Sequence, residues 1–368
     1  MRIAFLITRS DTVGGSHIHV RDMGLALMND GNNVAILIGG NGPIVNMFES
    51  SGLITYRIKN LVRNISPLKD YKAFYEIKKS LHSFSPDIIS THSSKAGFLG
   101  RLAASRLEIP VLFTAHGWSF TTGKKKYVRK LYQSLERAVL PMTDMVITVS
   151  EYDRNLALKE LSVPADKVIT IHNGMKDIHD SFISDQNTEG IINIVKIARF
   201  DNQKNHIELI NSISDINNIH LHFIGDGPLM EIVQSRATEL GLDKSITYWG
   251  RISSVEKVLS GCQIFTLISN WEGFPRSTLE AMRAGLPVVV SDVGGAAEAI
   301  EHGVSGYIVK KGDSKSLNLY IKELVFDHQK RKWMGDNARK RYEQLFRFDT
   351  MYKKTLSVYK NVLNDNNL

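Results

Sequence analysis

Two glutamates, Glu272 and Glu280, flank a proline in the stretch NWEGFPRSTLEAMRAGLP (270–287). The stretch follows an apolar run that is typical of a buried strand, and Pro275 suits the first position of a helix. We therefore expect Glu272 in the loop and Glu280 in the second helical turn. A helix start offers unpaired N–H groups and about half a positive charge, which suits a diphosphate. The two carboxylates can accept hydrogen bonds from sugar or ribose hydroxyls.

A pair of cations follows a second apolar run. In IARFDNQKNH (197–206), Arg199 and Lys204 lie just beyond a predicted strand. An arginine can grip a phosphate with two hydrogen bonds, and a lysine adds a mobile point charge. In a buried cleft, such a pair would stabilise a leaving diphosphate, which is work otherwise done by a metal ion. Two solvated surface cations are the alternative interpretation.

Glycines and a histidine follow two strands of the first half. Gly14 and Gly15, in DTVGGSHIHV (11–20), allow close backbone approach at the start of a helix. They do not form G-x-G-x-x-G, so the dinucleotide fingerprint is absent. His116 ends the run PVLFTAH and is followed by a glycine. The alternatives are an ordinary glycine-rich turn and a structural histidine.

Two further stretches place basic residues at expected helix starts, where positive charge is disfavoured. In THSSKAG (91–97), Ser93 or Ser94 could cap a helix with Lys95 in its first turn, so an anionic partner or simple capping explains the pattern. The second stretch, TTGKKKYVRK, carries Lys124, Lys125, Lys126, Arg129 and Lys130. Near an anionic leaflet each cation contributes at most about 1 kcal/mol. Two interpretations of this stretch remain open: it docks the protein reversibly on a membrane, or it is a solvated basic face.

Charge is distributed unevenly along the 368 residues, whose net charge is +8. Residues 1–178 hold 23 Lys+Arg against 15 Asp+Glu, whereas residues 179–368 hold 23 of each. This asymmetry indicates that the first half meets an anionic partner. No apolar run approaches the ~20 residues of a membrane helix, and the N-terminal run reads as a strand rather than a signal. The single cysteine, Cys262, excludes an internal disulfide and favours a reducing compartment.

Short apolar runs alternate with helical patterns twice along the chain, which predicts an α/β protein with two doubly wound parallel sheets. The expected strands are residues 2–8, 33–39, 87–93, 110–116, 145–150 and 167–174, then 192–199, 220–227, 246–251, 264–269, 287–292 and 306–309. A polar break at 177–190 separates two expected Rossmann-like domains, 1–178 and 179–345. We expect the helical segment 346–368 to cross back to the first domain. Ligands of such sheets bind beyond the carboxyl ends of the strands, in a cleft between the domains.

These motifs resemble those of the retaining glycosyltransferases of family 4, over nearly the whole chain. The similar features are E-x7-E, R-x4-K, T-x-H-G and the paired glycines; Ala198 replaces a glycine that the family has before the arginine. The resemblance implies a GT-B fold of two Rossmann-like domains across a cleft. It implies catalytic roles for His116, Arg199, Lys204 and Glu272, with Glu272 on the donor sugar and Glu280 on the ribose.

The resemblance also implies two binding sets. Donor binding is expected at Gly14, Gly15, Gly225, Gly227, Trp249, Gly250, Arg251, Gly273, Phe274, Pro275, Arg276, Ser277, Thr278, Leu279 and Glu280. Acceptor or membrane contacts are expected at His92, Ser93, Ser94, Lys95 and the basic stretch. The glycine loop with Gly294 and Gly295 resembles the acceptor side of the second domain.

The resemblance implies a retaining hexosyltransferase that extends polyprenyl-diphosphate-linked saccharides. The expected donor is a UDP-hexose or UDP-N-acetylhexosamine, the product is α-linked, and the pathway is surface polysaccharide (O-antigen or capsule) biosynthesis. We expect no cofactor, no metal and no nucleic acid partner, and a place on the cytoplasmic face of the plasma membrane. D-x-D is absent, and the H-x-H pairs at His17/His19 and His220/His222 are interpreted as structural. A sugar-nucleotide 2-epimerase, a phosphorylase and a basic nucleic-acid binder are the alternatives.

Overall fold

A computed structural model describes residues 1–11, 13–121, 125–188 and 190–365. The chain divides into two compact units, each built around one parallel sheet. The first unit comprises residues 1–172 and 351–368, and the second comprises residues 173–350. The expected fold class, two parallel sheets with helices, is confirmed.

The sheet of the first unit has seven strands in the order β3-β2-β1-β4-β5-β6-β7. The strands are β1 (Arg2–Ile7), β2 (Asn33–Gly39), β3 (Ile54–Ile58), β4 (Ile88–His92), β5 (Val111–Ala115), β6 (Met145–Thr148) and β7 (Val168–Thr170). The order reverses between β1 and β4, which is the switch point where ligands of such sheets bind. In the parallel register, His92 at the end of β4 pairs with Ile7 of β1 and Thr114 of β5.

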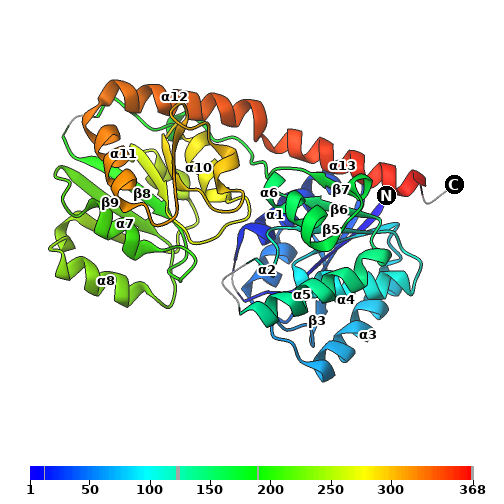
Figure 1. The fold of residues 1–368 in the computed structure, drawn as a ribbon. Coiled ribbons are helices and arrows are strands. Elements are labelled where there is room, and N and C mark those ends of the chain that lie inside the picture. The colour runs from blue at the N-terminus through cyan, green and yellow to red at the C-terminus, as the bar shows by residue number, and fades with distance from the viewer. Residues whose placement is uncertain (12, 122–124, 189, 366–368) are drawn as a thin grey trace. The chain divides into compact units, whose positions relative to one another are not determined.

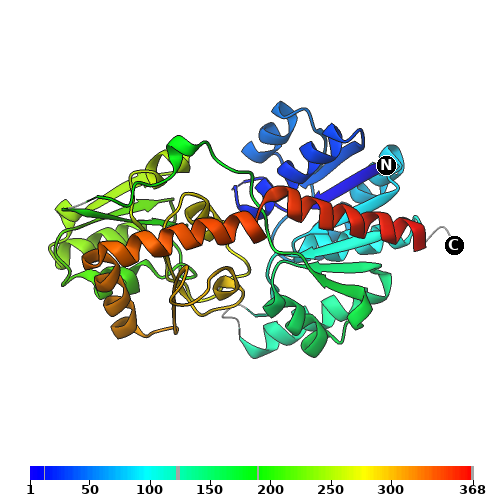
Figure 2. The ribbon, with the colours of Figure 1, turned by 90° about the horizontal axis from the view of Figure 1, so that it is seen from above.

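Helices cover both faces of this sheet (Figure 1). They are α1 (Gly15–Asn29), α2 (Pro43–Ser50), α3 (Pro67–Phe84), α4 (Ser94–Ser105), α5 (Lys126–Val139), α6 (Glu151–Leu156) and α13 (Phe348–Asp365). Because both faces are covered, the central strands are apolar at almost every position, as in the fully buried run Ile3–Ile7. Figure 2 shows α13 against this unit, where the Tyr352 hydroxyl donates to Asp30 Oδ2 at 2.5 Å.

The sheet of the second unit has six strands in the order β10-β9-β8-β11-β12-β13. They are β8 (Ile192–Ile197), β9 (Ile219–Ile224), β10 (Ile246–Gly250), β11 (Ile264–Leu267), β12 (Val288–Ser291) and β13 (Gly306–Val309). The helices are α7 (His206–Ile213), α8 (Met230–Glu239), α9 (Val255–Leu259), α10 (Arg276–Arg283), α11 (Ser314–Phe326) and α12 (His328–Leu345). Here the order reverses between β8 and β11. The loops after these two strands carry Arg199, Lys204 and Glu272.

Candidate active site

A lysine and a carboxylate meet at the switch point of the second sheet. Lys204 Nζ lies 2.6 Å from Glu272 Oε1, and their side chains are only 18% and 5% exposed. Gln203 Nε2 donates to Glu272 Oε2 at 3.3 Å and to the Trp271 carbonyl at 2.8 Å. The two loops are therefore joined through side chains and backbone, and the carboxylate has a fixed orientation. Sequence reasoning had not selected Gln203.

The exposed side chain of Arg199 follows β8 directly, at the same end of the sheet as the lysine–carboxylate pair. Neighbouring parallel strands β8 and β11 end at one edge, so the loops after them share that edge. A phosphate arriving here would find a half-buried ammonium and an accessible guanidinium, which can bind it bidentately. The expectation that these chemistry-bearing residues follow strands agrees with their observed positions.

Lys196, within β8, is a functional candidate that the sequence analysis missed. Its side chain is fully buried, and Nζ donates to the Lys204 carbonyl and, at 2.8 Å, to the Ile268 carbonyl. Burial, reinforced by the charge of Lys204, holds the pKa of Lys196 well below its ordinary value of 10.5. Lys196 thus ties the loop after β8 to the end of β11. The signal in the sequence that could have identified it is a lysine inside the apolar run INIVKI.

Of the glycines expected near the donor, Gly225 and Gly227 lie in the loop after β9, and Gly250 is the last residue of β10. Gly225 has φ +139°, and its N–H donates to the Gly250 carbonyl at 2.8 Å. A Cβ on Gly225 would approach the Ala198 carbonyl oxygen to 2.1 Å, so a side chain cannot be accommodated without backbone movement. Gly227 similarly packs on the Phe200 carbonyl. These contacts bring the loop after β9 against the loop that begins with Arg199.

Two side chains near Gly250 have partners within the second unit. Arg251 Nε lies 2.9 Å from Asp226 Oδ2, with both side chains about half exposed at 48% and 49%. The exposed indole of Trp249 donates from Nε1 to His222 Nδ1 at 3.1 Å. Burial, with the charge of His220, lowers the pKa of His222 to about 4, which keeps this ring neutral as an acceptor.

The helix α10 begins one residue later than expected, because Pro275 is its N-cap residue rather than its first helical residue. Phe274 packs its ring on Phe346 in the core, with centroids 5.4 Å apart, and Leu279 is fully buried. These side chains face the interior, whereas Gly273, Arg276 and Ser277 are half-buried. Thr278 is fully buried, with its hydroxyl oxygen lacking a hydrogen-bond partner in the described residues.

Glu280 lies in the second turn of α10, as expected, and is half-buried. Burial raises the pKa of its carboxyl above the ordinary value, and the neighbouring Arg283 and Arg276 oppose that rise. A carboxyl in this setting gains from hydroxyl groups that donate hydrogen bonds to it.

Gly294, in the loop after β12, packs on the backbone of Glu272. Its φ is +58°, and a Cβ would lie 1.9 Å from the Glu272 carbonyl oxygen. The glycine loop therefore sets the position of the residue whose side chain binds Lys204. This contact is a structural reason for the glycine in addition to any contact with a ligand.

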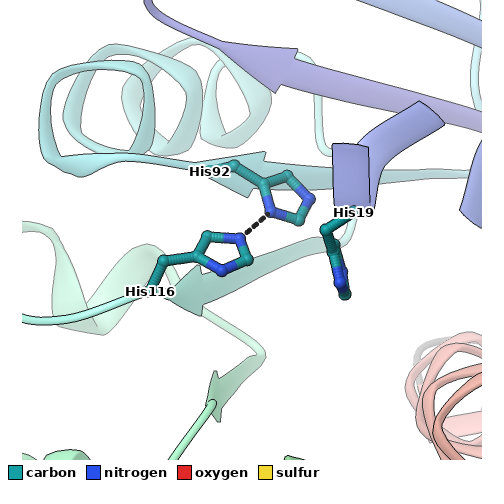
Figure 3. A group of neighbouring side chains, drawn as sticks. All are labelled: His19, His92 and His116. Atoms are coloured by element: carbon teal, nitrogen blue, oxygen red, sulfur yellow. Dashed lines mark hydrogen bonds between the residues drawn. The ribbon is translucent and has the colours of Figure 1, made fainter. Parts of the chain in front are cut away.

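Three histidines gather at the switch point of the first sheet (Figure 3). His92, at the end of β4, contributes Nδ1 to a 2.9 Å hydrogen bond with Nε2 of His116, which follows β5. His19, in α1, completes a group whose three ligand-type nitrogens lie within 4.8 Å of one another. Burial, with the neighbouring His116, His19 and His17, lowers the pKa of His92 well below 6.5. His92 is fully buried and contacts His116, and its expected contact with the acceptor or the membrane stays a prediction.

The two histidines of the first H-x-H pair have different surroundings. His17 is buried and pairs its ring with the Arg9 carbonyl at 2.8 Å and the Gly14 N–H at 3.2 Å, which agrees with a structural role. His19 instead joins His92 and His116. The sequence could not show this convergence because the three histidines come from separate elements. Gly14 is the N-cap of α1 and Gly15 its first residue, and both are exposed.

The start of α4 places Ser93 at the N-cap with φ +74°, but its side chain makes no capping hydrogen bond. Thr8 Oγ1 instead accepts the Ala96 N–H at 3.0 Å and lies 2.7 Å from Ser93 Oγ. Ser94 is the first helical residue. Lys95 forms an ion pair with Asp70 at 2.5 Å, so its unfavourable place at a helix start has a compensating partner within the chain.

The basic stretch lies at the start of α5, with Lys125 as its N-cap and Lys124 outside the described residues. Lys125, Lys126 and Lys130 are exposed. Arg129 contributes Nε as a donor to the Phe120 carbonyl at 2.7 Å, which gives it a structural role. Tyr127 and Leu131, near the start of the same helix, have an exposed aromatic and an exposed aliphatic side chain. Across the described residues, no helix combines the length and the hydropathy needed to span a bilayer.

Each half of the chain matches a model of a known protein family. Residues 13–177 match the family model described as Glycosyltransferase Family 4, and residues 180–341 match Glycosyl transferases group 1. The chain belongs to glycosyltransferase family 4. The observed sheets give this glycosyltransferase the GT-B fold, as expected from the motifs.

Individual relatives extend over most of this glycosyltransferase. A UDP-Gal:alpha-D-GlcNAc-diphosphoundecaprenol alpha-1,3-galactosyltransferase of Escherichia coli is 28% identical over 353 residues, covering 90% of each chain. The O-antigen biosynthesis glycosyltransferase WbnH of the same species is 24% identical and covers 81% of this chain and 83% of its own. The crystal structure of Anabaena Alr3699/HepE in complex with UDP and glucose has a TM-score of 0.84 at 19% identity, covering 98% of this chain and 100% of that one.

Proposed function

We propose that this glycosyltransferase transfers a hexose or N-acetylhexosamine from a UDP-sugar to a hydroxyl of a polyprenyl-diphosphate-linked saccharide. The transfer retains the anomeric configuration and forms an α-linkage, in the biosynthesis of a surface polysaccharide. The observation that carries the proposal is the Lys204–Glu272 pair beside Arg199 at one edge of the second sheet. A relative whose name includes a UDP-sugar and a diphosphoundecaprenol acceptor supports the same donor and acceptor classes.

In the proposed donor complex, the diphosphate binds to Arg199, Lys204 and the N–H groups at the start of α10. Charge develops on the leaving phosphate during transfer, and positioned cations stabilise it more strongly than they stabilise the intact donor. Glu272 accepts a hydrogen bond from a sugar hydroxyl, and Glu280 accepts hydrogen bonds from the ribose. Lys196 holds the Lys204 backbone through its carbonyl and so positions the cation. In this proposal, the protein's cations supply the charge stabilisation without a metal ion.

The acceptor hydroxyl binds beside His116 in the first unit. Attack on the face that the diphosphate leaves retains the configuration, and the leaving phosphate takes the acceptor proton. The C–O bond to the acceptor forms as the bond to the phosphate oxygen breaks. His116 orients the hydroxyl, while the hydrogen bond between its Nε2 and His92 fixes the ring. Among the described residues, the cluster at this point consists of three imidazoles without a carboxylate, which favours same-face attack over a covalent intermediate.

The acceptor's polyprenyl chain stays in the bilayer, so the enzyme has to work at its surface. Exposed lysines at the start of α5 are suited to anionic lipid headgroups. Tyr127 and Leu131 can enter the interfacial region beside them. We accordingly place the enzyme on the cytoplasmic face of the plasma membrane, where nucleotide sugars are available.

The test is a transfer assay with a synthetic polyprenyl-diphosphate N-acetylglucosamine acceptor and a panel of UDP-hexoses and UDP-N-acetylhexosamines. We expect mass spectrometry to show the acceptor plus one sugar, with an α anomeric signal by NMR, in the presence of a chelator. A β signal would overturn retention. Sugar isomers formed from the donor without any acceptor would instead identify a 2-epimerase.

A further inference from the structure

We propose that His19, His92 and His116 form a binding site for one transition-metal ion of the zinc class. The proposed transfer chemistry uses no metal, but this site shares His116 with the proposed acceptor site, and it depends on residues of the first unit alone. A bound ion would replace the hydrogen bond between His92 and His116 Nε2 that fixes the His116 ring, so we expect it to inhibit transfer.

The three rings have the mutual spacing of a tetrahedral three-histidine centre. Their centroids are 5.1 Å apart for His19 and His116, 5.2 Å for His92 and His116, and 5.6 Å for His19 and His92. A tetrahedral ion about 2.1 Å from three imidazole nitrogens would hold the ring centroids about 5 Å apart. In centroid spacing the observed triangle is close to that of a site with three protein ligands and one open position, and the nitrogens, which lie within 4.8 Å of one another, would approach to about 3.4 Å around an ion.

The three imidazole ligands determine which metal ions can bind. Imidazole suits zinc, copper, nickel and cobalt, whereas magnesium and calcium prefer oxygen ligands. Metal binding requires neutral imidazoles, and His92 is fully buried. His19 is also buried, so little surrounding water competes for the ion. We therefore expect Zn²⁺ or Co²⁺ to bind and Mg²⁺ not to bind.

A second layer of contacts orients the cluster. Ser90 Oγ lies 3.2 Å from His92 Nε2 in the interior, which directs Nδ1 of the same ring toward His116. Metal binding at Nδ1 would replace the hydrogen bond between His92 and His116 and would require the His92 proton on Nε2, from which it can be donated to the serine oxygen. Such outer contacts fix the tautomer of metal-binding histidines. The strand β4, the end of β5 and the helix α1 supply the three rings, so regular elements hold the site.

The direct test is a titration of chelator-treated, untagged full-length protein with Co²⁺, followed by its visible absorption. We expect one equivalent of Co²⁺ with the intense bands of a tetrahedral site, displaced by Zn²⁺. His19→Ala and His116→Gln should each weaken Co²⁺ binding by at least about 100-fold, because each loses one of three ligands. His220→Ala is the matched control, since His220 and His222 form only a pair with centroids 4.9 Å apart, and it should leave binding unchanged.

Circular dichroism and thermal unfolding in chelator establish that each variant is folded before its titration is interpreted. Wild-type protein without a tetrahedral Co²⁺ spectrum would overturn the proposal. Equal Co²⁺ affinity in the His19→Ala variant would also overturn it, because the ion would then be bound elsewhere. These results do not depend on transfer activity, so failure of the proposed function and failure of the metal site are separately visible.

Discussion

Lys204 Nζ and Glu272 Oε1 lie 2.6 Å apart although their residues are 68 positions apart in the chain. The pair joins the loop after β8 to the loop after β11 at the switch point of the second sheet. Glu272 is nearly buried and Lys204 is only partly exposed, so their attraction is less screened than that of a surface pair. The lysine is thus held in place before an anion arrives.

This arrangement predicts opposite consequences for the two partners. Lys204→Met removes the charge that we propose contacts the diphosphate, and we expect UDP to bind about 10- to 100-fold more weakly. Glu272→Gln removes the negative charge and one of the two acceptor oxygens that we propose for a sugar hydroxyl, but it leaves the cation. We expect it to bind UDP as well as wild type or better, while losing its preference for UDP-sugar over UDP. Calorimetric titration of both ligands measures this, and parallel losses in the two variants would contradict the assigned roles.

Gly294 predicts a test of how Glu272 is positioned. A Cβ at this residue would meet the Glu272 carbonyl at 1.9 Å, so Gly294→Ala must displace that backbone. Since displacement of a reacting group by ~1 Å can cost about 100-fold, we expect turnover to fall by at least that factor. Gly303→Ala is the matched control, because Gly303 has φ +78° but a Cβ there would meet no described atom within 4 Å. If both variants lose turnover equally, backbone strain rather than contact with Glu272 is responsible.

Lys196 predicts a dependence of stability on pH. Its pKa in the folded state is depressed below the ordinary 10.5, so the unfolded chain binds more protons between the depressed pKa and 10.5. The free energy of unfolding of wild type should therefore rise through this window relative to Lys196→Met, whose side chain does not titrate. Urea unfolding of both proteins at neutral pH and at about pH 10 measures the difference. The free energy of unfolding of wild type minus that of Lys196→Met should increase with pH. If this quantity stays constant or decreases, Lys196 is not a buried lysine with a depressed pKa.

The basic stretch at the start of α5 predicts that the protein binds anionic membranes electrostatically. Replacing Lys125, Lys126 and Lys130 with glutamine should weaken sedimentation with phosphatidylglycerol vesicles by about 100-fold, at roughly 1 kcal/mol per lysine. The matched control replaces Lys353, Lys354 and Lys360, three exposed lysines of α13, with glutamine. Equal losses in the two triple variants would show that net charge, rather than this stretch, determines binding.

Much of the fold is readable in the sequence because both faces of each sheet are covered, which makes the strands continuous apolar runs. The strand β3 was not predicted, since ITYRI lies at the sheet edge and only Ile58 is buried. Loops that follow strands were also readable, and these carry Arg199, Lys204 and Glu272.

The side-chain contacts of the site were less predictable. Lys196 was not predicted, because lysines are rarely fully buried. Its role also depends on hydrogen bonds to two carbonyls from different loops, which the sequence does not show. The histidine cluster requires the strand order β1-β4-β5, which brings together residues from three elements. Lys95 and Arg129 have partners within the chain that spacing could not show.

Titration of UDP into wild-type protein and into Arg199→Ala, with a chelator present, tests the central claim most directly. Arg236→Ala serves as the control, because Arg236 is paired with Glu239 on α8. The proposal that cations and helix-start amides hold the diphosphate predicts chelator-resistant binding, about 100-fold weaker in Arg199→Ala and unchanged in Arg236→Ala. Binding that appears only when a divalent metal is added, or that is equally tight in Arg199→Ala, would contradict it.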